Sequence, residues 1–433
     1  MDQDVDGSHI KGLIMNFLFY KWPSLMNIDN FVVSLITPIV KATKKVGKNV
    51  QSFYTLTDYE NWKKTVNMKD WNIKYYKGLG TNTSKESKEY FSKLDENTTN
   101  YKLTDECKKN LELAFDKKLT NDRKKWLNEY NKETIIERNE KNVSVSDFIN
   151  KDLIPFSNYD NERSIPSMID GFKPSQRKIL FAALKKNLTN EIKVAQFSGY
   201  VSEHSAYHHG EMSLQGAIIN MAQNFVGSNN INLLEPIGQF GTRLQGGKDH
   251  ASPRYIFTKL NDLTNILFHK DDNYLLNYLD DDGMKIEPEY YLPILPTVLI
   301  NGSEGIGTGW STKLPSFNPL DILESIRNLI NNKAIKNIKP WYRHFKGDII
   351  TPEWNGKDFN EIDKIYSIGK YEIKKNKVII TELPIGIWTE PYKEYLETII
   401  NDSSNKKNYI ESYKSKSTDI EVYFEITFKQ DIL

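Results

Sequence analysis

Residues 174–184 read Pro-Ser-Gln-Arg-Lys-Ile-Leu-Phe-Ala-Ala-Leu, and this stretch decides how the middle of the chain folds. Proline suits the first turn of a helix, where its missing N–H is not needed. Ile179, Ala182 and Ala183 then recur at helical spacing. A second apolar stripe with this spacing runs over 214–225, and a Gly-rich segment at 238–247 is expected to form a hairpin. Two short helices and a hairpin predict a winged-helix domain, which we place at 146–295.

The chain before this domain divides into two regions. Residues 1–83 are interpreted as an α/β unit, with an apolar helix near 10–22 and strand-like segments at 31–36 and 52–56. Residues 84–145 are highly charged and carry sparse apolar positions at helical spacing. This pattern predicts a helical connector.

The last region, 296–433, has an α+β pattern. Strand-like runs occupy 377–382 and 421–428, and a helix is expected around 392–400. The predicted fold class is therefore a multidomain α+β protein.

Composition excludes several classes of protein. The 433 residues include 58 basic and 57 acidic ones, so any contact with nucleic acid must come from local clusters. A single cysteine, Cys107, rules out an internal disulfide and a Cys-based zinc site. No run of about 18 apolar residues is present, so we expect no membrane span. The acidic start also lacks the basic region of a signal peptide.

Asp2, Asp4 and Asp6 alternate along the chain and lead into Gly7. Three carboxylates this close repel one another, which favours a hard divalent cation such as Mg²⁺. An acidic turn without a ligand remains open from these residues alone. A calcium-binding EF-hand loop is excluded, because its twelfth position requires glutamate and Leu13 stands there.

Arg254 and Tyr255 follow a Gly-rich turn that carries Arg243 and Lys248. A phenol is a poor nucleophile at neutral pH, but nearby cations favour its ionised form. Arg254 could also stabilise charge on a phosphate under attack. The chain has 24 tyrosines, so local features leave open whether Tyr255 is a nucleophile or simply packed.

Two further segments carry basic or imidazole groups. His208 and His209 are adjacent and so rarely bind one metal together, although one of them could contact a phosphate. Between positions 171 and 193 there are six basic residues and one acid, Glu191. This local excess of positive charge favours phosphate contacts, and a solvated helix face is the alternative. These six are Lys173, Arg177, Lys178, Lys185, Lys186 and Lys193.

Residues 305–311 read Gly-Ile-Gly-Thr-Gly-Trp-Ser. An exposed Ile306 between two glycines could wedge between base pairs and bend a duplex. A tight turn with a packed isoleucine is the alternative. The glycine spacing excludes a nucleotide-binding fingerprint.

Taken together and in this order, eight segments closely resemble eukaryotic-type type IIA DNA topoisomerases. They are Asp2-Gln3-Asp4-Val5-Asp6-Gly7-Ser8-His9-Ile10-Lys11-Gly12-Leu13, Tyr75-Tyr76-Lys77-Gly78-Leu79-Gly80-Thr81, Arg163-Ser164-Ile165-Pro166, 170–178, Ala206-Tyr207-His208-His209-Gly210-Glu211, 222–228, Arg254-Tyr255 and 304–311.

The resemblance implies a role for each matching residue. Asp2, Asp4 and Asp6 match the TOPRIM acids that hold Mg²⁺. Tyr255 matches the nucleophile that forms a 5′-phosphotyrosine bond. Arg254 and His209 match its catalytic partners. The implied DNA contacts are Lys77, Arg163, His208 and the intercalating Ile306, beside the basic candidates Lys173, Arg177, Lys178, Arg243 and Lys248.

The resemblance also implies partners and a setting. The fold would comprise a partial TOPRIM unit, the connector, the winged helix and a tower domain. The substrate would be double-stranded DNA, the assembly a homodimer, and the location the nucleus, with a role in chromosome segregation. ATP would be used by an ATPase domain upstream of this chain. A catalytic Glu-Gly-Asp segment is also expected upstream, and a coiled coil beyond Leu433.

These expectations leave three functional classes to compare. The first is the cleavage core of a DNA strand-passage enzyme. The second is a catalytically incomplete DNA-binding fragment of that enzyme. The third, a TOPRIM nuclease or primase, would not need a tyrosine embedded in a winged helix.

Overall fold

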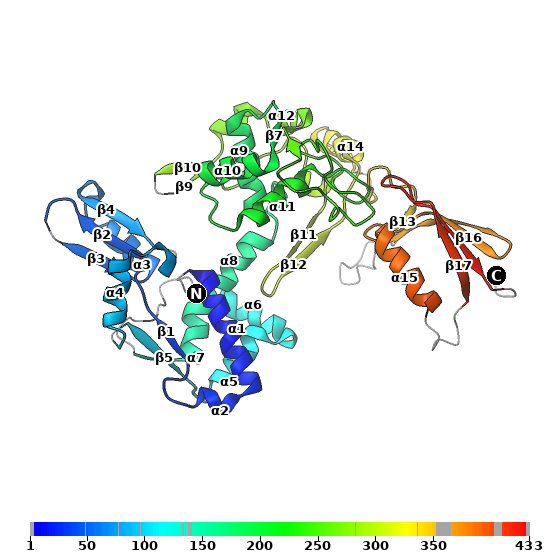
Figure 1. Ribbon diagram of the computed structural model, residues 1–433. Helices are drawn as coiled ribbons and strands as arrows, with labels where there is room; N and C mark the ends of the chain where they lie inside the picture. Colours follow the sequence, from blue (N-terminus) through cyan, green and yellow to red (C-terminus); the bar gives the residue numbers. More distant parts are fainter. Residues whose placement is uncertain are drawn as a thin grey trace. The chain divides into compact units, whose positions relative to one another are not determined.

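The computed structural model describes residues 4–47, 49–76, 78–95, 97–131, 134, 136, 141–281, 283–335, 337–351, 365–401 and 409–429. The chain divides into two units, many of whose elements are labelled in Figure 1. The first unit comprises Met1–Ser164 and Ile306–Ser311. The second comprises Ile165–Gly305 and Thr312–Leu433.

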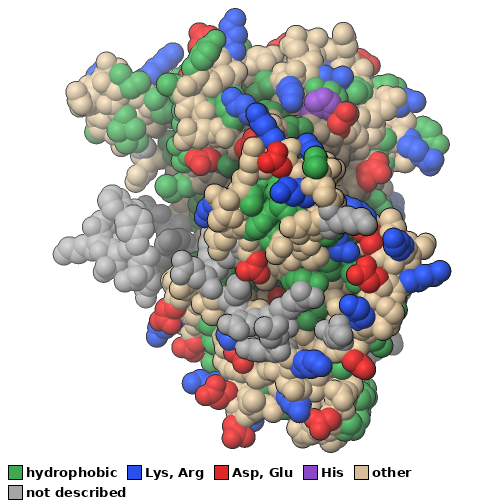
Figure 2. Space-filling view, turned by 90° about the vertical axis from the view of Figure 1, so that its left-hand side faces the viewer, with side chains coloured by type: hydrophobic (Ala, Val, Ile, Leu, Met, Phe, Trp, Pro, Cys, Tyr) green, Lys and Arg blue, Asp and Glu red, His purple; other side chains and the backbone are tan. Residues whose placement is uncertain are grey.

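Charged side chains of both signs are spread over the surface. On the face seen in Figure 2, Lys and Arg side chains are interspersed with Asp and Glu, as expected for a net charge of +1. Among the helices of the described ranges, none is both long and apolar enough to cross a membrane.

Two small sheets and a set of helices build the first unit. β1 (Val33–Leu35) pairs antiparallel with β5 (Thr98–Lys102), which runs parallel to β6 (Asn142–Ser144). β2 (Val40–Lys44) lies between β3 (Val50–Phe53) and β4 (Trp71–Tyr75), antiparallel to both. The helical elements are α1 (Val5–Lys21), α2 (Pro23–Met26), α3 (Leu56–Lys63), η1 (Met68–Asp70), η2 (Leu79–Thr81), α4 (Ser84–Ser92), α5 (Cys107–Phe115), η3 (Lys117–Leu119), α6 (Thr120–Asn128), α7 (Val145–Asp147), η4 (Phe148–Leu153) and α8 (Ile154–Ser164).

The core of the first unit holds α1 against η4 and α5. Met15 and Phe148 are both buried in one cluster. Gly12 allows close packing, because a Cβ there would lie 3.2 Å from the Phe115 ring and 3.3 Å from Leu153. The helix predicted near 10–22 is confirmed, although it begins earlier, at Val5, so that Asp4 is its N-cap and Asp6 lies in its first turn.

The charged stretch 84–145 is helical at α4, α5 and α6, but it is not helical throughout. Residues 98–102 form β5, where Thr98 and Thr99 pair with β1. The expectation of helix is wrong at this point. Tyr101 is 6% exposed and packs in the core, a role that the flanking charges conceal in the sequence.

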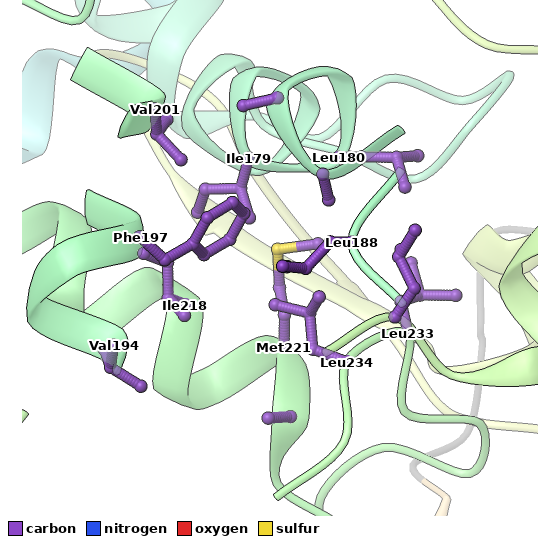
Figure 3. Packing of buried hydrophobic residues seen from close by; sticks show 14 of the residues in the cluster. Ile179, Leu180, Leu188, Val194, Phe197, Val201, Ile218, Met221, Leu233 and Leu234 are labelled. Carbon is purple, nitrogen blue, oxygen red and sulfur yellow. The ribbon is translucent and has the colours of Figure 1, made fainter. Parts of the chain in front are cut away.

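Three helices form the core of the second unit (Figure 3): α9 (Pro174–Lys186), α10 (Val194–Ser205) and α11 (Glu211–Ala222). Ile179, Phe197 and Ile218 come from the three helices and are fully buried in one cluster. The two apolar stripes that predicted α9 and α11 are therefore confirmed as core-facing.

The C-terminal part of this unit contains a four-stranded antiparallel sheet and a helix. The strand order is β15 (Lys370–Lys374), β16 (Lys377–Glu382), β18 (Phe424–Phe428) and β17 (Ile410–Ser415). α15 (Thr389–Asn401) contributes Leu396 to a cluster with Phe424. The predicted strands and helix are confirmed, although β18 is shorter than expected.

The other elements are β7 (Ile192–Lys193), β8 (Phe257–Thr258), α12 (Asp262–Leu267), η5 (Lys270–Tyr274), β9 (Tyr278–Asp281), β10 (Met284–Pro288), α13 (Thr297–Ile300), β11 (Ser303–Ile306), β12 (Ser311–Leu314), α14 (Pro319–Ile330), β13 (Asp348–Ile350) and β14 (Tyr366–Ile368).

The Gly-rich segment 238–247 is not a hairpin. It is a loop of successive turns, bounded by isolated bridges that join Leu234 to Leu260 and Ile237 to Phe257. Gly238, Gly241 and the later glycines have positive φ values, which suit a tight loop better than extended strands.

Candidate functional site

Buried hydrogen bonds fix the loop that leads to Tyr255. The Gln223 side chain donates to the carbonyl oxygens of Phe240 (2.8 Å) and Gly247 (3.2 Å). Thr242 donates from its backbone N (2.9 Å) and its hydroxyl (2.6 Å) to the Asp249 carboxylate. Gly247 has a φ of +81°, and a Cβ there would lie 2.3 Å from the Gln223 amide nitrogen. The loop is therefore held in one shape that requires glycine at this point.

Tyr255 projects into solvent from the end of this loop and is 70% exposed. The next residue, Ile256, is 1% exposed in the core, and its carbonyl oxygen accepts from the N–H of Val194 at 3.0 Å. Arg254 is also exposed, and its Cζ atom lies 5.6 Å from the centroid of the Tyr255 ring. An anchored backbone thus presents an accessible phenol beside a cation, as nucleophilic attack on a phosphodiester requires.

The adjacent histidines have different neighbours. His208 is exposed, and its Nε2 atom lies 3.3 Å from Asp281 Oδ2. His209 is also exposed, and its ring is edge-on to Tyr207 with 5.4 Å between centroids. Both imidazoles therefore lie at the surface of the second unit.

Arg177 and Lys178 of α9 are used inside the second unit. Arg177 is 7% exposed and donates to the Asp170 carboxylate from Nε (2.8 Å) and Nη2 (3.0 Å). Lys178 donates to Glu287 (2.8 Å) and to the carbonyl oxygen of Ser205 (2.5 Å). Internal carboxylates already compensate both charges, which argues against the predicted DNA contacts of these two residues.

Arg243 is likewise buried, at 6% exposure, and pairs with Glu382. This pairing likewise argues against its predicted DNA contact. Lys173 is half-buried at the start of α9, and Lys248 is exposed, so both stay candidates for phosphate contact. Lys77 lies outside the described residues.

The two described residues of the acidic triplet already have partners. Asp4 caps α1, since its Oδ1 atom accepts from the N–H of Gly7 at 2.8 Å. Asp6 pairs with Arg163 through contacts of 2.8 and 3.2 Å. Asp2 lies outside the described residues. Among the residues that the structure describes, no three His, Cys, Asp or Glu side chains are grouped so that they could hold a metal ion. Carboxylate oxygens do suit Mg²⁺, and the cap uses only one oxygen of Asp4. The carboxylates of Asp4 and Asp6 therefore suit the ion, provided that Asp6 releases Arg163.

A polar chain within the first unit links Arg163 to residue 308. Arg163 Nε lies 3.8 Å from Asp160 Oδ1, and the Thr308 hydroxyl donates to Asp160 Oδ2 at 3.0 Å. The Asn161 amide donates to the carbonyl oxygen of Thr308 at 3.1 Å. Ile306, in the same segment, is 75% exposed, which excludes the alternative of a packed isoleucine.

Glu86 organises the chain just before position 77. It accepts hydrogen bonds from the Tyr76 hydroxyl (2.5 Å), the Lys74 ammonium (2.9 Å) and the N–H of Thr83 (2.8 Å). Burial alone would raise the pKa of Glu86, but these hydrogen bonds outweigh burial and lower the pKa to about 2. The cluster fixes the end of β4 through charge-assisted hydrogen bonds.

Comparisons with known proteins agree with this geometry. A family model of the A subunit of DNA gyrase/topoisomerase IV matches residues 163–433, which is more than half of the chain. This chain belongs to the type IIA DNA topoisomerases. A second model, the C-terminal associated domain of TOPRIM, matches residues 35–161.

Eukaryotic DNA topoisomerases 2 are among the relatives of this topoisomerase chain. DNA topoisomerase 2 of Arabidopsis thaliana is 51% identical over 434 residues, covering 99% of this chain and 29% of the relative. The mitochondrial DNA topoisomerase 2 of Dictyostelium discoideum is 50% identical, covering 100% of this chain and 33% of the relative. The predicted resemblance is confirmed. The chain spans about a third of the length of these curated relatives.

A solved structure supports the same family. The crystal structure of the DNA-binding, cleavage and re-ligation domain of Plasmodium falciparum topoisomerase II is 47% identical to this chain, with a TM-score of 0.78. The similarity covers 99% of this chain and 57% of that one.

Three acids of this topoisomerase chain received no role from the sequence. Asp170 precedes a basic helix, and that proximity was the available signal for its pairing with Arg177. Glu382 carries no comparable signal, because its partner Arg243 lies 139 residues away, and the bond of Asp160 to Thr308 likewise spans 148 residues. All three hold cationic or polar groups of the candidate site in place.

Proposed function

We propose that this chain performs the transient double-strand DNA cleavage and religation of a type IIA topoisomerase, the central step of ATP-dependent strand passage. One observation carries the proposal: the exposed Tyr255 phenol stands beside Arg254 at the end of a rigid loop. Both residues lie in the segment that the family model matches.

The proposed reaction is a reversible transesterification. The Tyr255 phenolate attacks the phosphorus of a DNA phosphodiester, and the P–O3′ bond breaks. The departing 3′-oxygen takes up a proton, which balances the proton that the phenol loses. One phosphoester bond replaces another, so religation needs no ATP. Arg254 stabilises the charge on the phosphate oxygens, and His209 contacts the same phosphate.

DNA binding is proposed to rest on a reduced set of residues. Lys173, Lys248, Arg163 and His208 would contact phosphates and supply affinity without sequence preference. Ile306 would enter the base stack and bend the duplex. Lys77 keeps the DNA-contact role that the resemblance implies.

Mg²⁺ is the proposed cofactor, held by Asp2, Asp4 and Asp6. When bound, the ion would neutralise charge on the phosphate and on the departing oxygen. Arg163, which pairs with Asp6, would then be released to contact a phosphate.

The proposed architecture follows the sequence interpretation. Residues 1–83 would be the C-terminal part of a TOPRIM domain, and 84–145 a connector. Residues 146–295 would form the winged helix and 296–433 a tower domain. We also propose a homodimer, and a nuclear location for a role in chromosome segregation. Because one relative is named mitochondrial, imaging of the tagged protein would decide the compartment.

A chimera tests the proposed activity. The 433 residues replace the matched segment of the Arabidopsis relative, and the protein is given supercoiled plasmid, Mg²⁺ and ATP. We expect relaxation and a denaturant-trapped protein–DNA adduct, both lost in Tyr255→Phe. The matched control is Tyr274→Phe, which alters another exposed tyrosine (93%) and should retain both activities. An adduct that survives in Tyr255→Phe would remove Tyr255 as the nucleophile.

A catalytically incomplete DNA-binding fragment is the second candidate function. It is favoured by one observation: Asp6 is already paired with Arg163. It predicts salt-dependent binding of duplex DNA by the 433-residue chain, and no adduct from that chain alone. Binding without salt dependence would contradict both functions, because both rest on phosphate contacts.

A further inference from the structure

The loop that leads to Tyr255 closes the N-terminal end of α15. The N–H of Thr389 donates to the carbonyl oxygen of Arg243 at 3.3 Å, and the N–H of Glu390 donates to that of Leu244 at 2.9 Å. N–H groups in the first turn of a helix have no partner within the helix. The loop therefore supplies the acceptors that α15 needs, and the two segments hold each other in place.

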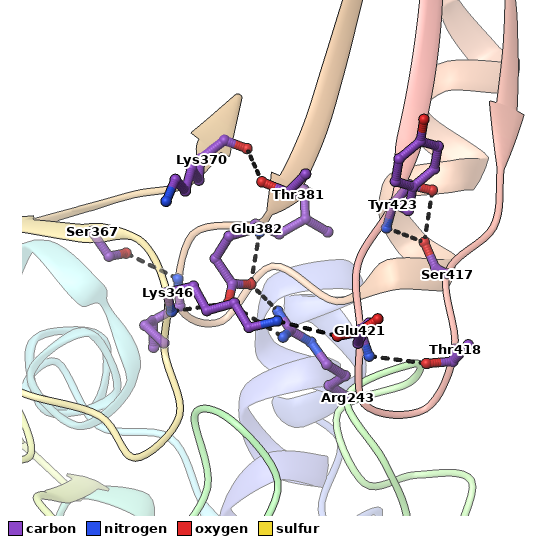
Figure 4. A network of polar contacts seen from close by, with 12 residues as sticks. Arg243, Lys346, Ser367, Lys370, Thr381, Glu382, Ser417, Thr418, Glu421 and Tyr423 are labelled. Atoms are coloured by element: carbon purple, nitrogen blue, oxygen red, sulfur yellow. Dashed lines mark hydrogen bonds and ion pairs between the residues drawn. The ribbon is translucent and has the colours of Figure 1, made fainter. Parts of the chain in front are cut away.

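A buried ion pair joins the same loop to β16 (Figure 4). Glu382, the last residue of β16, is 1% exposed and accepts from the Arg243 guanidinium. Its carboxylate also accepts from the N–H groups of Leu383 (3.0 Å) and Lys346 (3.2 Å). A charge buried this deeply depends on its partner, so the pair fixes the loop at one point on the sheet.

Trp388 packs against the same loop. A Cβ at Gly246 would lie 2.3 Å from the Trp388 indole nitrogen, so the close approach requires glycine. The indole is also edge-on to Phe225, with 5.7 Å between ring centroids. The loop is thus held by an ion pair, by two backbone hydrogen bonds and by a packed indole.

We propose that Arg243 and Glu382 are a positioning pair for the nucleophile. The pair transmits the position of β16 and α15 to the Gly-rich loop and so sets where the Tyr255 phenol stands. This inference rests on the proposed function, because it assigns the pair to the placement of the attacking group. Neither residue touches the reacting atoms.

Hydrogen exchange on the 433-residue chain tests the proposal without any need for cleavage. We expect Glu382→Gln to raise the exchange of amides in 241–256 by about 10-fold, through local opening of the loop. The matched control is Glu425→Gln, which breaks the part-buried pair that Glu425 forms with Lys377 at the opposite end of β16. This control should leave exchange in 241–256 unchanged.

A double variant separates positioning from simple stability. In Glu382→Gln the Arg243 charge stays buried without a partner, and the variant itself could fail to fold. Arg243→Met combined with Glu382→Gln removes that charge and should restore much of the stability. If the pair positions the loop, fast exchange in 241–256 persists in the double variant. A purely structural pair would instead allow exchange to return to the wild-type rate.

The chimera supplies the functional measurement. At saturating DNA we expect the double variant to form about 10- to 100-fold less adduct, the usual effect of a displaced reacting group. Its affinity for DNA should stay near that of the wild type. Wild-type exchange together with wild-type adduct formation in the double variant would overturn the proposal. If the wild-type chimera forms no adduct, the proposed function fails, whereas the exchange data still decide whether the pair holds the loop.

Discussion

The Asp170–Arg177 pair predicts that Arg177→Met damages the fold and leaves phosphate binding intact. Asp170 is fully buried, and its carboxylate accepts from Arg177 Nε (2.8 Å) and Nη2 (3.0 Å) and from the N–H groups of Phe172 (3.0 Å) and Tyr291 (2.9 Å). Without the guanidinium, a buried carboxylate keeps only the two backbone donors. Such a loss costs about 3–5 kcal/mol, a large part of the roughly 5–15 kcal/mol that stabilise a typical domain.

Urea unfolding and DNA binding measure the two sides of this prediction. We expect the transition of the second unit to move to lower urea in Arg177→Met, while the salt dependence of DNA binding by the folded protein stays the same. The control is Lys173→Met. It should reduce the slope of log DNA affinity against log salt concentration by about 1 and change stability by less than about 0.5 kcal/mol. A weakened slope with an unchanged urea midpoint in Arg177→Met would refute the reasoning.

Three further changes test other parts of the structure. The pKa of Glu86 is depressed to about 2. The ionised Glu86 therefore stabilises the fold fully above its ordinary pKa, and this stabilisation is lost as pH falls from 4.5 toward 2. In Glu86→Gln the free energy of unfolding, measured across acid pH, should lack about 2 kcal/mol of this pH dependence, a value discounted for the 19% exposure of the side chain. An unchanged pH profile would contradict the role of the Glu86 hydrogen bonds. Ile306→Ala should reduce DNA bending, measured by energy transfer between duplex ends, with little loss of affinity; full bending would exclude intercalation. Gly247→Ala should destabilise by about 2–3 kcal/mol in urea unfolding, whereas Gly283→Ala, which also has positive φ but open space around its Cβ, should cost about 1 kcal/mol; equal costs would show that Gln223 does not constrain the loop.

Periodic elements could be predicted from the sequence because each carries its own signal. The apolar stripe that includes Ile218 defined α11, and Pro174 marked the start of α9. The order of the family motifs identified the family, and Tyr255 is exposed as a nucleophile requires. These inferences depend on residues close together in the chain.

Contacts between distant residues could not be predicted in the same way. Lys178 meets Glu287 across 109 residues, and Arg243 meets Glu382 across 139. A count of charges along the chain treats such cations as available for DNA, although tertiary partners have already compensated them. The strand β5 was missed for a related reason, since its pairing with β1 depends on a neighbour about 65 residues away.

Mass spectrometry of the DNA-linked peptide tests the central claim most directly. The chimera is trapped on DNA with denaturant, and the adduct is digested with nuclease and protease. The account predicts a nucleotide joined through its 5′-phosphate to the phenolic oxygen of Tyr255. A nucleotide on any other side chain, or a link through a 3′-phosphate, would contradict it.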